Sequence, residues 1–415
     1  MQLVPSILLL LASIYLHYQA SLDVLGNFFP RLKQGYQRRS LDKRSPVRRT
    51  AETLANSFGY LCEAHTVITD DGYILTVHRI RKFPPTSDKQ HSVALLLPGF
   101  MASSDSWLFR GSNKDLPYIF ADAGYDMWMY NPRGNVYSRN HVVLDPDVDE
   151  KFWNFSFHEM GVYDLPAVID YILKFTKEQK VSITAHSMGA AISFVTCSLK
   201  PEYNKKISLI IALAPAAVIN LESLNMATKT LIHMAPLLEK FLRHRRSFEI
   251  FPQRKLNGKL AELLCSDDSP SQELCLSSVF EVTGRDYEQF NSTMLPTAFH
   301  YYPSGTSLGT VMHMVEVFQG QFQYDSSGKS KEMDEYSHDT PYNLSKVTTP
   351  VAIFYGKKDQ MVQKKDLERL AKQLDQVVGL YKVPHHSFNH LDFMWASDSA
   401  LLLYTHLLNL MEMYK

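Results

Sequence analysis

The chain has 415 residues, of which 45% are hydrophobic and 12% aromatic, and its formal net charge is +0. This length and apolar content predict a folded protein with one large domain, or with a domain that carries a sizeable insertion. The balanced charge argues against nucleic acid as a general partner. Four cysteines without CxxC spacing are too few for a disulfide scaffold and do not form a zinc motif.

The N-terminus begins with an apolar run over residues 3–16. The run is shorter than the ~20 apolar residues that a membrane-spanning helix needs, so it predicts a secretory signal peptide over residues 1–20. A signal anchor is the alternative, because no basic residue precedes the run. Residues 21–50 contain several dibasic pairs and are interpreted as a basic leader or pro-segment. No transmembrane segment is expected in the mature chain.

The next elements predict an α/β fold with a mostly parallel sheet. Two runs rich in β-branched and aromatic residues, 63–69 and 73–80, flank Asp70-Asp71-Gly72 and indicate a β-hairpin. Apolar runs at 93–97 and 207–213 are typical of buried strands, and residues 125–130 are predicted to form another strand. A helical spacing over 163–175 separates two of them, which favours a parallel sheet with helices on both faces.

The strand–helix pattern stops near residue 217 and returns at strand 351–355. Helix 364–374, strand 377–383 and helix 399–413 then complete the chain. The intervening block is rich in Met, Phe and Leu, is prone to form helices and has no clear strand. We therefore predict a core over 51–217 and 341–415, interrupted by a helical cap or lid over 218–340.

A sharp strand–turn–helix sequence, VSITAHSMGAAISF, contains Ser187 in an A-x-S-x-G context. This arrangement is typical of a nucleophile elbow, in which a strained turn lifts a serine hydroxyl above the edge of the sheet. Ala185 replaces the first glycine of the motif, and alanine is the next smallest residue. Because a free hydroxyl is a weak nucleophile, Ser187 requires a histidine base and a carboxylate that orients it.

Candidate partners of Ser187 follow the last two strands, in the chain order expected for this fold. Asp359 lies directly after strand 351–355, where the functional edge of a parallel sheet is found. Asp366, on the next helix, is the weaker candidate for the acid. His390 is predicted as the base because it opens a helix after strand 377–383, with His385 and His386 as alternatives.

The developing oxyanion requires backbone donors in addition to the triad. One is the N–H of Met188, the residue after the nucleophile, and the other is expected from the loop after an early strand. Pro98-Gly99-Phe100 is that loop, so the N–H of Phe100 is the second candidate.

Together these residues give the chain a resemblance to the acid lipase family, the group of lysosomal acid lipase and gastric lipase. The matching stretches are DDGYILTVHRI (70–80), LLLPGFMASSDSW (95–107), NPRGNVYSRNH (131–141), FWNFSFHEMGVYDLPAVIDYI (152–172), the elbow, YPSGTS (302–307) and FNHLDFMWA (388–396). The resemblance implies the α/β-hydrolase fold with an inserted helical cap, and Ser187, Asp359 and His390 as the triad. It also implies that Phe100 and Met188 line the oxyanion hole, and that a disulfide joins Cys265 to Cys275. Ala185, Met188 and Pro98 depart from the usual family residues without removing a catalytic group.

Other polar residues receive structural interpretations. Arg133 is expected to tie loops at the sheet edge, and His158, Glu159 and Asp164 to cap or pair near a helix start. Cys62 has no evident role, and Cys197 is expected to be a buried free thiol. No cluster has metal-ligand spacing, so neither a metal nor a cofactor is predicted. Asn154, Asn291 and Asn343 occupy glycosylation sequons, and the aromatic surroundings of Asn154 favour a buried position.

We predict a secreted or lysosomal lipase that hydrolyses neutral lipid esters, triacylglycerols or sterol esters, at a lipid–water interface through an acyl-enzyme. A carboxylesterase acting on shorter, more soluble esters is the alternative. A third hypothesis, from a different functional class, is a lipid carrier without catalytic activity. Retention of all three triad residues argues against it. The sequence leaves the preferred lipid and the pH optimum open.

Overall fold

The computed structural model describes residues 49–82, 92–253, 255–324 and 340–415. The expected signal peptide and residues 21–48 of the expected leader lie outside these residues. Thr50 caps the first described helix, α3 (Ala51–Ser57), by accepting a hydrogen bond from the Thr53 N–H. The first described helix therefore begins at the residue where the predicted core begins.

Within the described residues, nine strands form one mixed sheet. Its main path runs in the order β1-β2-β4-β3-β6-β7-β12-β13, and β5 pairs with β2. The pairs from β4 to β13 are parallel, whereas β1, β2 and β5 pair antiparallel at one side. The strand bounds are β1 (Tyr60–Ile68), β2 (Tyr73–Lys82), β3 (Val93–Leu97), β4 (Asp126–Met129), β5 (Asn140–His141), β6 (Val181–His186), β7 (Ile207–Leu213), β12 (Val351–Tyr355) and β13 (Val377–Lys382).

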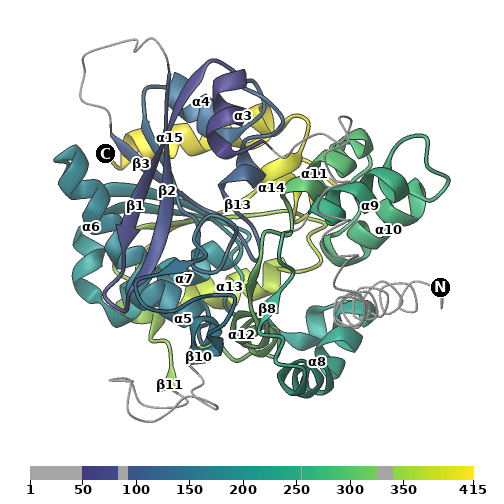
Figure 1. Ribbon diagram of the computed structural model, residues 1–415. Helices are drawn as coiled ribbons and strands as arrows, with labels where there is room; N and C mark the ends of the chain where they lie inside the picture. Colours follow the sequence, from purple (N-terminus) through teal and green to yellow (C-terminus); the bar gives the residue numbers. More distant parts are fainter. Residues whose placement is uncertain (1–48, 83–91, 254, 325–339) are drawn as a thin grey trace.

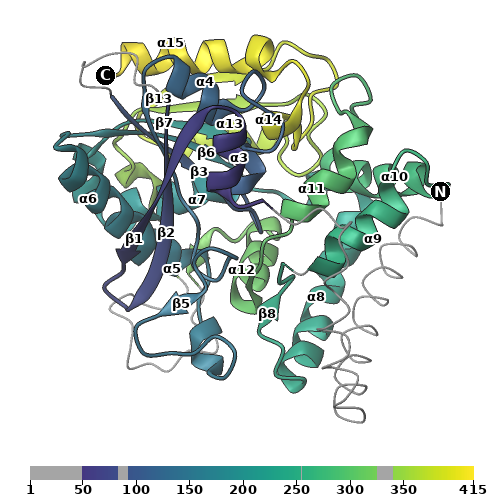
Figure 2. The same cartoon turned by 45° about the horizontal axis from the view of Figure 1, so that its top comes forward.

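Helices cover both faces of this sheet, which explains the continuous apolar strands. Every residue of β3 and of β12 is buried. The helices α6 and α7 lie together against one face, and α4 lies near the C-terminal helices, as Figures 1 and 2 show. The bounds are α4 (Leu116–Asp122), α5 (Phe157–Glu159), α6 (Leu165–Thr176), α7 (Met188–Leu199), α13 (Lys364–Gln373), α14 (Asp392–Trp395) and α15 (Thr405–Met413).

The predicted hairpin is confirmed, with longer strands than expected. β1 and β2 pair from Tyr60 with Lys82 to Ile68 with Ile74. Gly72 ends the connecting turn at φ 93°, and a Cβ there would lie 2.8 Å from the His141 ring. Glycine at this position therefore satisfies both the backbone conformation and the close approach of β5.

Between β7 and β12 the chain forms mainly helices, which lie beside the sheet in Figure 1. Their bounds are α8 (Met226–His244), α9 (Lys255–Cys265), α10 (Gln272–Thr283), α11 (Leu295–Tyr301) and α12 (Leu308–Phe318). A disulfide joins Cys265 to Cys275 across the α9–α10 connection. The expectation that this block has no strand needs a small correction, because β8 (Glu249–Ile250) pairs with β9 (Thr306–Ser307), and β10 (Gln323–Tyr324) pairs with β11 (Thr340–Pro341). These two-residue strands are too short to produce a recognisable sequence pattern.

Arg133 belongs to the loop that follows β4, and its side chain is fully buried. Its guanidinium contacts the carboxylates of Asp71 and Asp164 and stacks on the Tyr73 ring at 3.9 Å. Arg133 therefore ties loops together at the sheet edge, as expected. The neighbouring expectations hold too, since Glu159 forms a capping box with Ser156, and His158 bonds the Tyr342 hydroxyl.

Candidate active site

Ser187 stands in a strained turn between β6 and α7. Its backbone has φ 52° and ψ −118°, a conformation that side-chain-bearing residues rarely adopt. The neighbouring strand β7 holds the turn in place, because the Ser187 N–H donates to the Leu213 carbonyl at 2.9 Å. A Cβ on Gly189 would lie 2.7 Å from the Pro98 carbonyl oxygen, so only glycine allows α7 to pack this closely. These features are those of a nucleophile elbow.

The loop after β12 places a carboxylate opposite this turn. Asp359 Oδ1 accepts the backbone N–H groups of Met361 and Val362 at 2.8 and 2.9 Å. These two bonds fix the rotation of the carboxylate and leave Oδ2 directed at His390.

The three predicted residues form a continuous hydrogen-bonded relay. His390 Nδ1 lies 2.8 Å from Asp359 Oδ2, and His390 Nε2 lies 3.0 Å from Ser187 Oγ. All three side chains are buried. With Nδ1 protonated toward the carboxylate, Nε2 is left as the acceptor for the serine proton. The arrangement is therefore competent for nucleophilic acyl transfer.

The loop after β3 lies directly against the nucleophile. A Cβ on Gly99 would lie 3.3 Å from Ser187 Cβ and 2.8 Å from His186 Nδ1. Among the described residues, no group accepts a hydrogen bond from the backbone N–H of Phe100 or of Met188. The YPSGTS stretch supports this loop, because Ser304 donates its N–H to the Met101 carbonyl at 2.8 Å.

His186 contacts His390, and the sequence did not indicate this contact. Its Nε2–H donates to the His390 carbonyl at 3.0 Å, and the two rings lie 4.7 Å apart. Burial lowers the pKa of His186 well below its ordinary value, and the neighbouring His390 lowers it further. A neutral His186 therefore holds the backbone of the base without adding a charge beside it.

The C-terminal end of α10 also contacts both triad loops. The Thr283 carbonyl accepts the backbone N–H of His390 at 3.2 Å, and the Gly284 carbonyl accepts Asn389 Nδ2 at 3.0 Å. Gly284, at φ 103°, packs against the Lys358 carbonyl, which a Cβ would approach to 2.0 Å. No local sequence signal predicts this contact between the inserted block and the catalytic loops.

Comparison with known proteins decides the family. A model of the alpha/beta hydrolase fold matches residues 94–396, and a model of the partial alpha/beta-hydrolase lipase region matches residues 51–111. Over 380 residues the chain is 38% identical to Lipase 1 of Drosophila melanogaster, which covers 90% of this chain and 82% of that protein. Human gastric triacylglycerol lipase is 34% identical over 365 residues. The match covers 86% of this chain and 89% of that protein. The chain belongs to the acid lipase family. It is a lipase, a carboxylic ester hydrolase.

A solved structure supports the fold of the lipase. The esterase from Exiguobacterium antarcticum superposes with a TM-score of 0.52 at 14% identity, over 84% of this chain and 100% of that one. The predicted α/β-hydrolase fold is thus confirmed. No helix in the described part of the lipase combines the length and apolar character that a bilayer-spanning segment requires.

The alternative candidates for the triad lie elsewhere. Asp366 caps the start of α13, where it accepts the Asn220 N–H and the Ser223 hydroxyl. His385 Nε2 lies 2.8 Å from Asp286, and the exposed His386 lies 3.5 Å from Glu288. None of these residues is hydrogen-bonded to Ser187 or His390 in the described structure.

The remaining sequence predictions have mixed outcomes. Cys197 is a buried free thiol, as expected, and Cys62 is also buried and free. The expectation that Asn154 is buried is wrong, because its side chain is exposed while Trp153 and Phe155 on either side are buried. The two aromatic residues point into the core and leave Asn154 on the opposite side. Asn291 and Asn343 are exposed as well.

Proposed function

We propose that Ser187, His390 and Asp359 hydrolyse neutral lipid esters through an acyl-enzyme. His390 Nε2 takes the Ser187 proton as Oγ attacks the ester carbonyl carbon. Collapse of the tetrahedral intermediate breaks the bond to the alkoxy oxygen, which leaves as the alcohol with the proton from His390. Water then attacks the acyl carbon, gives one proton to His390, and releases the carboxylic acid as that proton returns to Ser187.

The observation that carries this proposal is the relay of 2.8 and 3.0 Å between three buried side chains. Asp359 remains ionised and stabilises the imidazolium that forms on His390. The N–H groups of Phe100 and Met188 are proposed to bind the oxyanion, since they border Ser187 and donate to no other described group.

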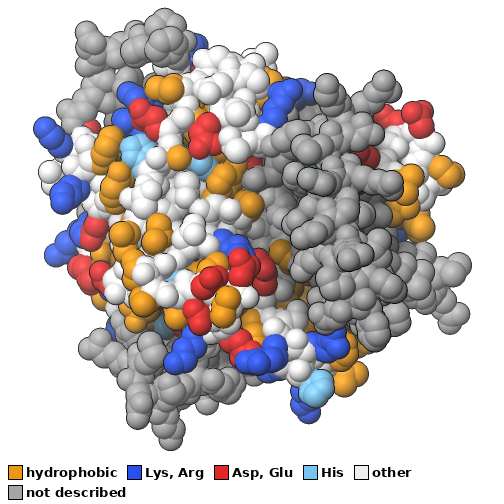
Figure 3. Space-filling view, viewed as in Figure 1, with side chains coloured by type: hydrophobic (Ala, Val, Ile, Leu, Met, Phe, Trp, Pro, Cys, Tyr) orange, Lys and Arg blue, Asp and Glu red, His pale blue; other side chains and the backbone are white. Residues whose placement is uncertain are grey.

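The inserted block over 218–340 is proposed to act as a lid that admits lipid. Exposed apolar side chains gather on its helices, and Figure 3 shows them over α8 and over the α9–α10 pair. The exposed apolar residues of these helices are Met226, Leu231, Met234, Leu237, Leu238, Phe241, Leu263, Leu264 and Leu274. Such a surface is costly in water and favourable at a lipid interface. The burial of Ser187 fits a closed form that dominates in solution.

Triacylglycerols are the proposed substrate class, with sterol esters as further candidates, since relatives at 34% identity are named gastric triacylglycerol lipases. A secretory route, to the extracellular space or the lysosome, is part of the proposal. The apolar N-terminal run, the Cys265–Cys275 disulfide and three exposed sequon asparagines support it.

The test compares Ser187→Ala with the unchanged enzyme on emulsified triolein, cholesteryl oleate and a soluble short-chain ester. Activity on all three is expected to fall by several orders of magnitude in the variant, because triad members act as a unit. Unfolding by heat serves as the control for an intact fold. Near-normal turnover by a folded Ser187→Ala enzyme contradicts the mechanism, whereas activity on the soluble ester alone favours a carboxylesterase.

A further inference from the structure

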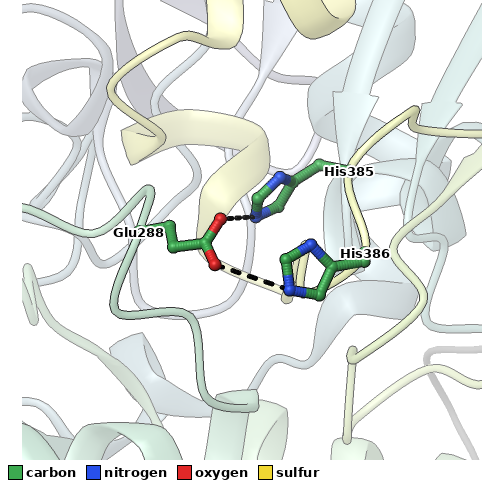
Figure 4. A group of neighbouring side chains, drawn as sticks. All are labelled: Glu288, His385 and His386. Carbon is green, nitrogen blue, oxygen red and sulfur yellow. Dashed lines mark ion pairs between the residues drawn. The ribbon is translucent and has the colours of Figure 1, made fainter.

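Two histidines and a glutamate lie close together at the surface. They are on the opposite side of the loop that carries the proposed base. Glu288 follows helix α10, and His385 and His386 follow strand β13 (Figure 4). The Glu288 carboxylate faces both rings, with Oε2 3.9 Å from His385 Nε2 and Oε1 3.5 Å from His386 Nε2. One ligand atom from each residue lies within 4.8 Å of the other two. The three ligand atoms are therefore close enough together to contact one ion.

A fourth side chain, Asp286, borders this group from inside. Its carboxylate is fully buried, and Oδ1 accepts the backbone N–H groups of Glu288 and Gln289, both at 3.1 Å. Oδ2 lies 2.8 Å from His385 Nε2, yet neither atom forms a hydrogen bond of acceptable geometry. The buried carboxylate of Asp286 and the imidazole of His385 thus lie side by side.

The charge around the group favours a cation. Among the described residues, Asp286 and Glu288 form ion pairs with these histidines and with no lysine or arginine. The two carboxylates therefore have no lysine or arginine as an ion-pair partner among the described residues, and their oxygens can face a cation.

We propose that Glu288, His385 and His386 bind a divalent transition-metal ion of the zinc type, with the buried Asp286 beside His385 as a supporting carboxylate. Tetrahedral zinc with bonds of ~2.0 Å places its ligand atoms roughly 3.3 Å apart. The Glu288 oxygens lie 3.5 and 3.9 Å from the two imidazole nitrogens, slightly farther apart than that value. Imidazole nitrogens select zinc, copper or nickel over calcium and magnesium, which prefer oxygen ligands.

The site is exposed to solvent on one side and buried on the other. His386 and Glu288 have side chains that are 66% and 63% exposed, whereas those of His385 and Asp286 are 10% and 0% exposed. A bound ion would join the segment after α10 to the loop that leads to His390. It would thereby reinforce the junction that the Thr283 carbonyl already makes with the base. The inference does not depend on the proposed triad.

The experiment uses the full chain, freed of metal by a chelator and dialysed. Zinc titration by calorimetry at pH 7.5 is expected to show one site per chain, and cobalt is expected to give the visible absorption of a four- or five-coordinate ion. His386→Ala and Glu288→Gln change exposed side chains, so both variants are expected to fold. Each should weaken zinc binding at least ~10-fold, as loss of a ligand or of its support does.

The control is His233→Ala, since His233 is an exposed histidine on α8 that lies outside the group. It should bind zinc as the unchanged chain does. Zinc should also raise the melting temperature of the unchanged chain and of His233→Ala, but not that of His386→Ala. Absence of zinc binding in the unchanged chain, or equal affinity in His386→Ala and Glu288→Gln, overturns the proposal and leaves a structural ion-pair group only. Binding should weaken as the pH falls, because protons compete for the imidazoles.

Discussion

The backbone N–H of His390 donates to the carbonyl of Thr283 at 3.2 Å. Thr283 is the last residue of α10, within the inserted block, and His390 is the proposed base in the core. The block between β7 and β12 therefore contacts the loop of the proposed base directly. One of its helices ends on the loop that positions the imidazole, so a change in this junction should reach the catalytic relay.

Gly284→Ala tests that junction. A Cβ at this position would lie 2.0 Å from the Lys358 carbonyl oxygen, next to the proposed acid, and alanine at φ 103° is strained in addition. We expect a large fall in kcat, measured on a soluble ester, together with a lower melting temperature. Gly59→Ala is the matched control, because Gly59 has φ 84° but no atom within 4 Å of its Cβ position. It should show only the backbone cost of ~1–2 kcal/mol and normal kcat. Equal kcat values for the two variants would argue against the junction.

His390→Ala separates the proposed base from its two neighbours in sequence. The Nε2 of His390 lies 3.0 Å from Ser187 Oγ, whereas His385 and His386 lie beside Asp286 and Glu288, outside the relay. We expect His390→Ala to lose activity by several orders of magnitude, and His385→Ala and His386→Ala to retain most of it. Steady-state rates on a soluble ester measure this difference. An inactive, folded His386→Ala enzyme would show that the base is misassigned.

His186→Gln tests the pH dependence of stability. The pKa of His186 is depressed in the folded protein by burial, so the unfolded chain binds a proton here that the native chain does not. The unfolding free energy therefore falls as the pH drops below the unfolded value of ~6.5. Glutamine is neutral at every pH and keeps an N–H near the position of Nε2. We expect the variant to lose less stability than the unchanged enzyme between pH 7 and pH 5, measured by urea unfolding. Parallel losses in both proteins would refute a buried neutral His186.

Leu237→Ser tests the proposed lipid-facing surface of α8. The Leu237 side chain is 70% exposed on that helix, so its replacement should leave the fold intact. We expect lower activity on emulsified triolein and unchanged activity on a soluble ester, because only the first substrate requires adsorption to an interface. Leu401→Ser, at a residue 81% exposed on the C-terminal helices, is the control and should change neither activity. The lid proposal also predicts a rate increase when the substrate passes its solubility limit, and first proteolytic cuts within the inserted block. A smooth saturation curve would favour a carboxylesterase.

The sequence alone determined those elements that depend on local chemistry. Buried strands such as β3 and β12 are recognisable because helices on both faces require every residue to be apolar. The elbow is recognisable because its strained turn and tight packing demand small residues around Ser187. Chain order then indicated Asp359 and His390, since the last strands of this fold end at the same edge of the sheet.

Tertiary structure alone decided the contacts between residues far apart in the chain. Three such contacts join separate segments of the chain. His186 donates to the His390 carbonyl, the end of α10 contacts the loop of His390, and Glu288 lies beside His385 and His386. A single sequence carries no signal for such pairs, because hydrophobic periodicity reports which face of an element is buried and not which element covers it. The position of Asn154 was misread for the same reason: its aromatic neighbours indicated burial, but their direction depends on a core built from distant strands and helices.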